Sequence, residues 1–371
     1  MRIVLVGLTH PYRGGISHFT TALHHSLSRN HDVCLISFSR LYPGFLFPGK
    51  TQFDFSGTPF GAEVSGTLDA LNPLTWISAL KTIGNFRPDR VVLVWWSPVS
   101  AFCYFFLARS CRRLNLGEPA FYCHNVYPHE DLPGGKILTR FALRSASRFL
   151  THSESDKRTL QELFPGVPVV KAFHPVYDVF PKTGIGQEEA RQKLSLNGHT
   201  LLFFGYVRKY KGLDCLIRAF SRVSRRMDCQ LVVAGEFYEP REMYERLIEE
   251  EGLRDRVVVH DRYIPNEEAE TYFAAADALV APYREASQSG IVQMAYHFDK
   301  PVIASDAGGL PEAIEDGHTG YVAPANDPDS LADAILEFYK NRETVPFEDN
   351  INKFKKRRSW EELAKIIAEP G

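Results

Sequence analysis

Residues 201–212 read LLFFGYVRKYKG, an apolar run that stops at a glycine and continues into a loop with three cations. Residues 213–223 follow with the apolar spacing of a helix that buries one face. A short buried strand, a glycine turn and an amphipathic helix form the repeating unit of parallel α/β folds. The stretch therefore predicts one strand–helix unit whose loop lies at the carboxyl end of the strand.

The same alternation extends across the chain in both directions. Short apolar runs predict strands at Ile3–Val6, Val33–Ile36, Arg90–Val94, Ala120–Cys123, Arg148–Thr151, Leu201–Phe204, Leu231–Ala234, Arg256–Val259, Ala278–Ala281 and Val302–Ala304. Helical patterns occupy gaps between them, at Ile16–Leu27, Leu213–Val223, Arg241–Glu251 and Pro328–Lys340. The alternation predicts an α/β protein with two Rossmann-like domains, each a parallel sheet covered by helices on both faces.

The alternation is interrupted once, where prolines and glycines replace a regular apolar period. We therefore expect an N-terminal domain at 1–173, a linker at 174–189 and a C-terminal domain at 190–342. A helix over about 346–370 is expected to pack back on the N-terminal domain. Parallel sheets bind ligands beyond the carboxyl ends of their strands. Two such domains facing across a cleft would share one composite site.

Composition narrows the class of protein. A length of 371 residues suits two domains, and a formal net charge of −2 argues against nucleic acid as a partner. Six cysteines lack metal-binding spacing, and Cys34, Cys123 and Cys229 fall in or beside expected strands, which suits a reducing cytoplasm. The chain opens directly on a strand, so no signal peptide is expected. Val91–Ala108 is apolar but interrupted, which favours a strand, a turn and a helix over a membrane span.

Two basic clusters stand out against this balance. One is residues 353–358, KFKKRR, and the other comprises Arg109, Arg112 and Arg113. Aromatic residues precede the second cluster: Trp95, Trp96, Tyr104, Phe105 and Phe106. Together they suggest that the N-terminal domain rests on an anionic membrane surface at the inner face of the cytoplasmic membrane. The alternative is that the cations are solvated and the aromatic residues belong to the core.

The first strand runs into residues 7–16, GLTHPYRGGI, before a helix begins. Gly14 and Gly15 would allow close backbone approach, and the helix amino terminus would present N–H groups to an anion. A plain tight turn is the alternative. The loop lacks the G-x-G-x-x-G spacing of dinucleotide-binding domains, which counts against a dehydrogenase.

Two further loops carry candidate residues in the C-terminal domain. Arg208 and Lys211 follow Gly205, where both could reach one diphosphate, unless they are simply solvated. The other loop and helix start, residues 282–293, read PYREASQSGIVQ. Its small and capping residues suit a phosphate or sugar hydroxyl groups, or merely a capped buried helix. The candidates here are Glu285, Gln288, Ser289, Gly290, Ile291 and Gln293.

These segments together resemble the retaining glycosyltransferases of group 1, family 4 of the sugar-transferase classification, which have the GT-B fold. The resemblance rests on Gly205-x-x-Arg208-x-x-Lys211-Gly212, on Glu285-x7-Gln293, on residues 300–305 (KPVIAS) and on 308–312 (GGLPE) leading to Gly320. It is strong over residues 200–325 and weaker before residue 173. Further matches are Asp277, Tyr263 with Ile264 and Pro265, Gly14-Gly15-Ile16, and His124-Asn125.

The resemblance implies roles for these positions. Arg208 and Lys211 would neutralise the donor diphosphate, and the Gly14-Gly15 loop would approach the same phosphates. Glu285 matches an acid near the donor sugar, although Gln288 or Ser289 could take that place. The second acid of the family, on the ribose, is replaced here by Gln293. His124 resembles a histidine near the donor sugar, with a core histidine as the alternative.

The resemblance also implies a reaction. A nucleotide-diphosphate sugar would give its sugar to a glycan or lipid-linked acceptor, with retention at the anomeric carbon, in cell-surface polysaccharide or glycoconjugate synthesis. No metal cofactor is expected, because no Asp-x-Asp pair is expected in a strand-end loop to hold a divalent metal between phosphates. A sugar-nucleotide 2-epimerase of the same fold is an alternative. So is a non-catalytic sugar-nucleotide-binding protein, which the departure at Gln293 suggests. The base, sugar and acceptor are not set by these residues.

Overall fold

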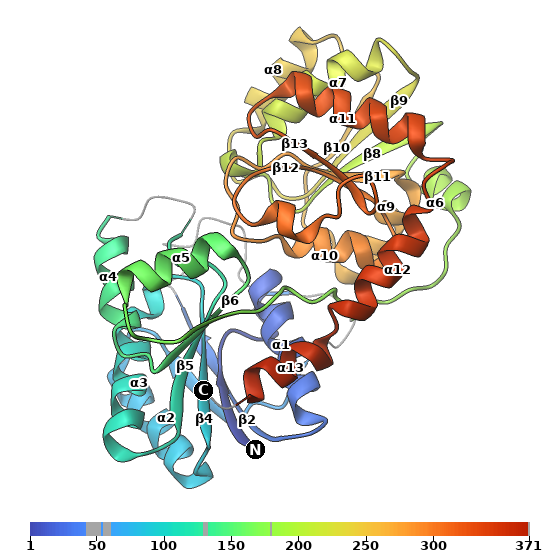
Figure 1. The fold of residues 1–371 in the computed structure, drawn as a ribbon. Coiled ribbons are helices and arrows are strands. Elements are labelled where there is room, and N and C mark those ends of the chain that lie inside the picture. Colours follow the sequence, from blue (N-terminus) through green and yellow to red (C-terminus); the bar gives the residue numbers. More distant parts are fainter. Residues whose placement is uncertain (42–52, 55–60, 129–132, 179, 370–371) are drawn as a thin grey trace. The chain divides into compact units, whose positions relative to one another are not determined.

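The computed structural model describes residues 1–41, 53–54, 61–128, 133–178 and 180–369 (Figure 1). These residues form two compact units. Unit 1 lies within Met1–Phe55, Pro59–Phe173 and Ser359–Gly371, and the main part of unit 2 is His174–Arg358.

Unit 1 is built on a parallel sheet of seven described strands in the order β3-β2-β1-β4-β5-β6-β7. Their bounds are β1 (Arg2–Val6), β2 (Asp32–Arg40), β3 (Gly66–Asp69), β4 (Arg90–Trp95), β5 (Glu118–Cys123), β6 (Arg148–Thr151) and β7 (Val169–Lys171). The central strands are runs of valine, leucine and isoleucine with side chains buried on both faces, as parallel sheets require.

Helices cover both faces of this sheet (Figure 1). On one side α1 (Gly15–Ser28) packs along α13 (Trp360–Ala368). On the other side α2 (Pro73–Phe86), α3 (Ala101–Leu114) and α4 (Gly135–Leu143) follow one another, with α5 (Glu154–Leu163) after β6. The short helix η2 (Pro98–Ser100) leads into α3. Right-handed crossovers place α1 opposite the later helices because the sheet order reverses at β1.

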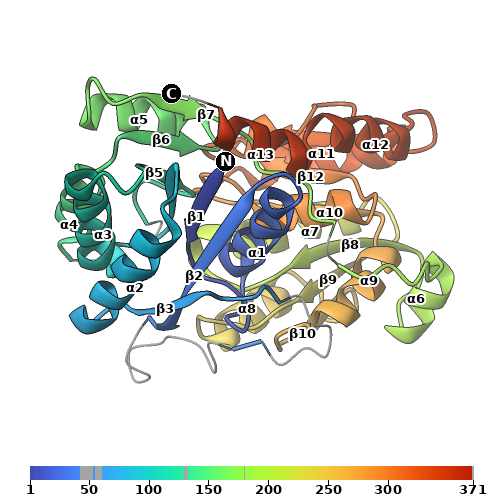
Figure 2. The ribbon, with the colours of Figure 1, turned by 90° about the horizontal axis from the view of Figure 1, so that it is seen from below.

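Unit 2 repeats this design with six described parallel strands in the order β10-β9-β8-β11-β12-β13. They are β8 (His199–Phe204), β9 (Cys229–Ala234), β10 (Val257–His260), β11 (Ala278–Ala281), β12 (Val302–Ser305) and β13 (Gly320–Ala323). One face is covered by α7 (Leu213–Ser224), α8 (Arg241–Glu250) and α11 (Pro328–Asn341). The other carries α9 (Asn266–Ala275), with α6 (Gln187–Lys193) packed beside it, and α10 (Gly290–His297) (Figures 1 and 2).

The predicted fold class is confirmed, and every predicted strand is present. Three strands were missed: β3, β7 and β13. All three lie at a sheet edge. Edge strands are short and half-buried, so their sequences lack the continuous apolar run that identifies a central strand.

The segment predicted as a linker packs on unit 2 over its described residues. The Glu270 carboxylate accepts hydrogen bonds from the backbone N–H groups of Thr183 and Gly184 at 2.5 and 2.8 Å. Tyr177 is buried, and the ring of His297 bonds the Phe180 carbonyl at 2.9 Å. The segment is therefore part of the unit rather than a free connection.

The expectation of one helix over about 346–370 on the N-terminal domain was wrong. Two helices occupy this stretch, α12 (Phe347–Arg357) in unit 2 and α13 in unit 1. The Ser359 hydroxyl accepts from the Glu362 N–H at 3.3 Å and so starts a new helix at the boundary. Trp360 then lies 5.3 Å from the Phe19 ring of α1, centroid to centroid.

Two other sequence features prove to be structural. Trp95 and Tyr104 are fully buried core residues, so neither can face a membrane. In the basic run of residues 353–358, Lys355 pairs with Asp299 and Arg357 with Glu315, which ties α12 to its own unit.

All six cysteines are buried and none forms a disulfide. Within the described residues, no helix has both the length and the apolar character needed to cross a membrane.

Candidate functional site

The loop after β8 brings two cations to the carboxyl edge of the unit 2 sheet. The short helix η3 (Lys209–Lys211) turns the chain so that Lys211 is only 7% exposed. Burial, with a contribution from the positive charge of Arg208, lowers the pKa of the Lys211 ammonium to about 7. The Lys211 Nζ also lies 5.4 Å from the ring centroid of Tyr283. A buried ammonium at a strand end is a group that an incoming anion would stabilise.

Arg208 is held by an aromatic ring. Its guanidinium carbon lies 4.3 Å from the ring centroid of Tyr238, and Tyr206 meets the same ring edge-on at 5.0 Å. Stacking uses the face of a guanidinium and not its N–H groups, which lie in the plane. Stacking on Tyr238 thus orients the Arg208 guanidinium, and its planar set of N–H groups has the geometry to bind phosphate oxygens.

Gly205 makes space for this arrangement. Its φ of +93° is a left-handed conformation, and a Cβ there would lie 3.3 Å from both Lys211 Nζ and a methyl carbon of Ile291. The glycine therefore links the β8 loop to the first turn of α10. Gly205, Lys211 and Ile291, which the sequence analysis named as candidates, are therefore close together.

The start of α10 is fixed by its cap. The Ser289 hydroxyl accepts from the Val292 N–H at 3.4 Å and lies 3.2 Å from the Tyr283 hydroxyl. Gly290 opens the helix, and a Cβ there would come within 3.3 Å of the Tyr177 ring. The first-turn amides of such a helix point toward the carboxyl edge of the sheet, where they suit an anion.

The three polar candidates of this segment lie in different environments. Glu285 is exposed on the loop, whereas Gln293 is 0% exposed within α10. The Gln288 amide donates to the Gly309 carbonyl at 2.7 Å and so ties the loop to the turn after β12. Glu285 and Gln293 are therefore not equivalent partners, despite their spacing in the sequence.

Gln293 has an unusual feature. Among the described residues, neither of its side-chain amide atoms has a hydrogen-bond partner, and the Gln288 Oε1 is also buried without one. Leaving a buried polar group unsatisfied costs about 1–3 kcal/mol. Such groups are typical of places where water or a ligand completes the bonding.

Tyr263 lies on the loop after β10, at the same edge of the sheet but two places from β8 in the strand order. Asp277, another matched residue, lies at the opposite edge, at the amino end of β11. Its buried carboxylate pairs with Arg191 at 3.0 Å and Arg342 at 3.2 Å. Asp277 therefore has a structural role.

In unit 1, the two predicted glycines, Gly14 and Gly15, lie after β1 at the start of α1. Gly14 has φ +109°, and a Cβ built there would meet no atom within 4 Å. Backbone conformation rather than crowding therefore favours glycine at this position, and the space beside it is open.

His124 follows β5 at the same edge of that sheet and belongs to a chain of rings. Its Nδ1 lies 3.2 Å from the Nε2 of His152, whose Nδ1 lies 3.4 Å from the Tyr122 hydroxyl. Phe19 of α1 packs edge-on against His124, with centroids 4.3 Å apart. The sequence did not identify His152, since a lone histidine at a strand end carries no spacing signal.

The direction of donation along this chain depends on the histidine tautomers. Donation from the buried Tyr122 hydroxyl to His152, and from His152 to His124, corresponds to the tautomer of His124 that carries its proton on Nε2. Donation in the opposite direction corresponds to a His124 proton on Nδ1.

Two further residues lie at these edges and were missed. Glu236 is 3% exposed just beyond β9, and Tyr283 is buried between the two candidate loops of unit 2. An acid directly after the glycine that ends a predicted strand was a usable signal for Glu236. No group of three metal-binding side chains occurs in the part of the chain that the structure describes.

Comparisons with known proteins agree with this geometry. Residues 198–341 match the family model described as glycosyl transferases group 1. The chain is 29% identical over 209 residues to alpha-D-kanosaminyltransferase of Streptomyces kanamyceticus, a match covering 55% of this chain and 54% of that protein. It is 27% identical over 208 residues to D-inositol 3-phosphate glycosyltransferase of Paenarthrobacter aurescens, covering 54% and 48%. The chain thus spans about half the length of the curated relatives it matches.

Solved structures resemble almost the whole chain. The Anabaena protein HepE in complex with UDP matches with a TM-score of 0.75 at 16% identity, covering 99% of this chain and 98% of that one. Sucrose-phosphate synthase from Thermosynechococcus elongatus matches with a TM-score of 0.70 at 18% identity, covering 99% and 97%. At these identities the likeness shows the fold, which is of the GT-B type.

Proposed function

We propose that the protein transfers a sugar from a nucleotide-diphosphate sugar to a hydroxyl group; the match of residues 198–341 to the model of group 1 glycosyl transferases supports this proposal. The observation that carries the proposal is the buried Lys211 beside Arg208 at the carboxyl edge of unit 2. A cationic site of this kind stabilises negative charge that develops on a leaving group.

The reaction requires one bond to break and one to form. The bond between the anomeric carbon and the diphosphate oxygen breaks, and its electron pair stays on the diphosphate. Lys211 and Arg208 neutralise this charge, together with the first amides of α10. The acceptor oxygen bonds to the anomeric carbon, and its proton passes to the departing phosphate. Attack on the face that the diphosphate leaves gives retention, as the family resemblance implies.

We propose that this charge stabilisation needs no divalent metal. Contrary to the expectation from the sequence, one Asp-x-Asp pair does follow a strand end, at Asp327 and Asp329 after β13, but it caps α11. Asp327 Oδ1 accepts from the backbone N–H groups of Asp329 and Ser330 at 3.0 and 3.1 Å. Arg222 pairs with Asp329. These carboxylates are used in the fold, so Lys211 and Arg208 are the better candidates for binding the diphosphate.

His124 is proposed to orient the donor sugar from unit 1. We propose the tautomer of His124 that carries its proton on Nε2 and donates it to a sugar hydroxyl. The Gly14-Gly15 loop lies at the same edge of that sheet, where its backbone suits the phosphates. Gln293 is proposed to bond the ribose, which would satisfy its buried amide. The other proposed donor contacts of unit 2 are Gly205, Glu285, Gln288, Ser289, Gly290, Ile291 and Tyr263.

The acceptor is proposed to be a glycan or lipid-linked sugar, with the protein peripheral on the inner face of the cytoplasmic membrane. Support comes from α3, where Arg109, Arg112 and Arg113 are exposed and Phe102 is 55% exposed. Aromatic and basic side chains together favour an anionic interface. Flotation with anionic vesicles at low salt tests this, and a failure to float would contradict it.

A thermal-shift panel of UDP-, GDP-, dTDP- and ADP-sugars tests donor binding. A donor at 100 times its dissociation constant should stabilise the protein by about 2.7 kcal/mol. Products formed with that donor then separate the alternatives. Nucleotide release that depends on acceptor supports transfer, a sugar nucleotide with inverted C2 indicates an epimerase, and binding without turnover indicates a non-catalytic protein. Proton NMR of the product reports retention.

A further inference from the structure

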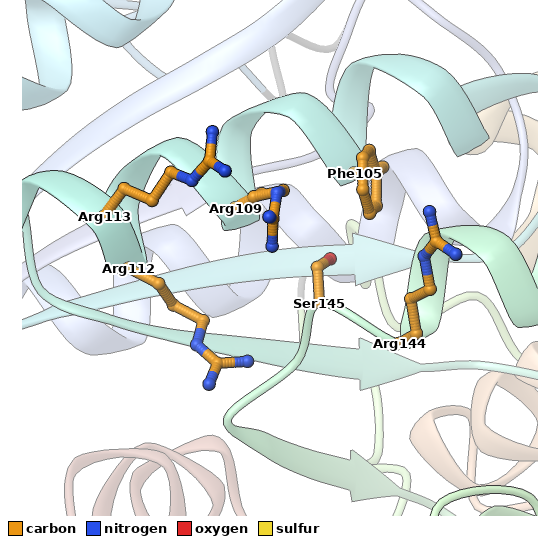
Figure 3. A pocket seen from close by; sticks show the side chains of 6 residues that line it. All are labelled: Phe105, Arg109, Arg112, Arg113, Arg144 and Ser145. Carbon is orange, nitrogen blue, oxygen red and sulfur yellow. The ribbon is translucent and has the colours of Figure 1, made fainter.

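A surface pocket of about 600 Å³ lies between the carboxyl-terminal parts of α3 and α4 in unit 1. Figure 3 shows four guanidinium groups around it, three from α3 and one from the end of α4. Its lining residues are Phe105, Arg109, Arg112, Arg113, Arg144 and Ser145.

The four arginines are not neutralised by the protein. Among the described residues, no carboxylate lies within ion-pair distance of any of them. Arg144 instead stacks on the rings of Phe105 and Phe141, at 4.8 and 4.6 Å from their centroids. The carboxyl ends of two helices contribute about −0.5 charge each, which offsets only about one of the four positive charges. The pocket is therefore complementary to an anion.

A second pocket of about 360 Å³ adjoins the first and is lined largely by rings. The two share Phe105, Arg109 and Arg113, while Trp76 and Phe102 line the second alone. Phe102 is 55% exposed, and Trp76 packs against Phe106 at 5.9 Å between centroids. A cationic pocket thus continues directly into an apolar one.

We propose that these two pockets form a single binding site for a phosphate-headed lipid. The phosphate would lie among the arginines, which provide planar forks for its oxygens, and an alkyl chain would lie along Trp76 and Phe102. This is more specific than general attraction to a charged membrane, because it requires head and chain on one molecule. It is also separate from the donor contacts proposed in unit 1, because neither Gly14, Gly15 nor His124 lines either pocket.

The location of the site suggests docking rather than chemistry. The arginines lie on the last two turns of α3 and at the end of α4, near the amino ends of the strands that follow. The 14 residues of α3 span about 21 Å. The arginine part of the site therefore lies about 12–18 Å along α3 from the carboxyl edge of its sheet, where Gly14 and His124 lie, whereas Phe102 is on the first turn of α3, nearer that edge.

Dodecyl phosphate below its micellar concentration is a suitable probe, measured by isothermal titration calorimetry on the full chain. We expect saturable binding of one molecule per chain. Arg112→Gln and Arg144→Gln remove head contacts only, and each should weaken binding about tenfold or more. Phe102→Ala should weaken dodecyl phosphate but leave binding of inorganic phosphate unchanged. Arg226→Gln, an exposed and unpaired arginine of unit 2, is the matched control and should have no effect.

Three results would overturn the proposal. They are non-saturable binding, an equal loss in the Arg226→Gln control, or inorganic phosphate binding as tightly as dodecyl phosphate, which would indicate a site for a free anion. The Lys211→Met variant keeps the test separate from the proposed transfer reaction. Loss of turnover in that variant with normal dodecyl phosphate binding supports two separate sites, whereas loss of both overturns the separation.

Discussion

The carboxyl edges of the two sheets have the same architecture but carry different chemical groups. In unit 2 the edge holds a buried cation, Lys211, and an amide, Gln293, whose bonds are incomplete. In unit 1 the edge holds His124 in a chain of rings with His152 and Tyr122. One edge is suited to an added negative charge, and the other presents an imidazole held by neighbouring rings. Residues placed on equivalent loops of one fold thus divide the proposed binding of phosphate and sugar between them.

Lys211→Met gives the largest expected effect on this comparison. Turnover should fall about 100- to 1000-fold, because a group stabilising the leaving charge is lost. The melting temperature should stay level or rise, since a buried ammonium without its anion is costly. Arg208→Ala should slow transfer to a similar degree. Steady-state kinetics and thermal melts measure both, and Lys209→Ala, an exposed neighbour, is the control. Near-normal turnover in the Lys211 variant would refute its role.

Removing the partner of His124 tests the other edge. His152→Phe should slow turnover about tenfold, because His124 then loses the hydrogen bond that fixes its Nε2 proton. Tyr122→Phe should cause a smaller loss in the same direction. Turnover at saturating donor and the melting temperature should be measured together. A lower melting temperature with unchanged turnover would mean that the histidines only pack the core.

Gln293 distinguishes a binding role from a packing role. Gln293→Ala should weaken donor binding by roughly tenfold, with less effect on turnover at saturation. Gln293→Leu should also weaken binding but stabilise the unliganded protein, since two unsatisfied amide atoms are replaced by apolar ones. Calorimetry and thermal melts on the same preparations measure this. An unchanged dissociation constant would exclude Gln293 from the site.

The pH dependence of donor binding gives the smallest expected effect. Donor phosphate should bind the charged form of Lys211, whose pKa is lowered to about 7 in the unliganded protein. Affinity should therefore be greatest below pH 7 and fall about fivefold between pH 7 and 8, with proton uptake on binding. The unliganded protein should instead gain stability from this group as pH rises from 7 toward 10, because unfolding restores a higher pKa. Titrations in two buffers of different ionisation enthalpy measure the proton, and Lys211→Met should abolish its uptake.

Local sequence was enough to predict the strands of both sheets and the loops at their carboxyl ends. The predicted strands are short apolar runs, because parallel strands are buried on both faces, and β1 and β8 are followed directly by a glycine. Gly205 and the helix cap Ser289 could be recognised from such local signals. Three of the four edge strands, such as β13, could not, because half of each is solvated.

The tertiary structure alone decided which of the recognised residues share an environment. The spacing of Glu285 and Gln293 suggested a pair, yet one is exposed and the other enclosed, because burial depends on which face of α10 meets the sheet. Likewise, the sequence contained both His124 and His152, but only parallel pairing of β5 with β6 brings residues 28 positions apart within 3.2 Å. Sequence therefore determined the elements and the chemistry available, while contacts between distant segments determined the charge, tautomer and exposure on which that chemistry depends.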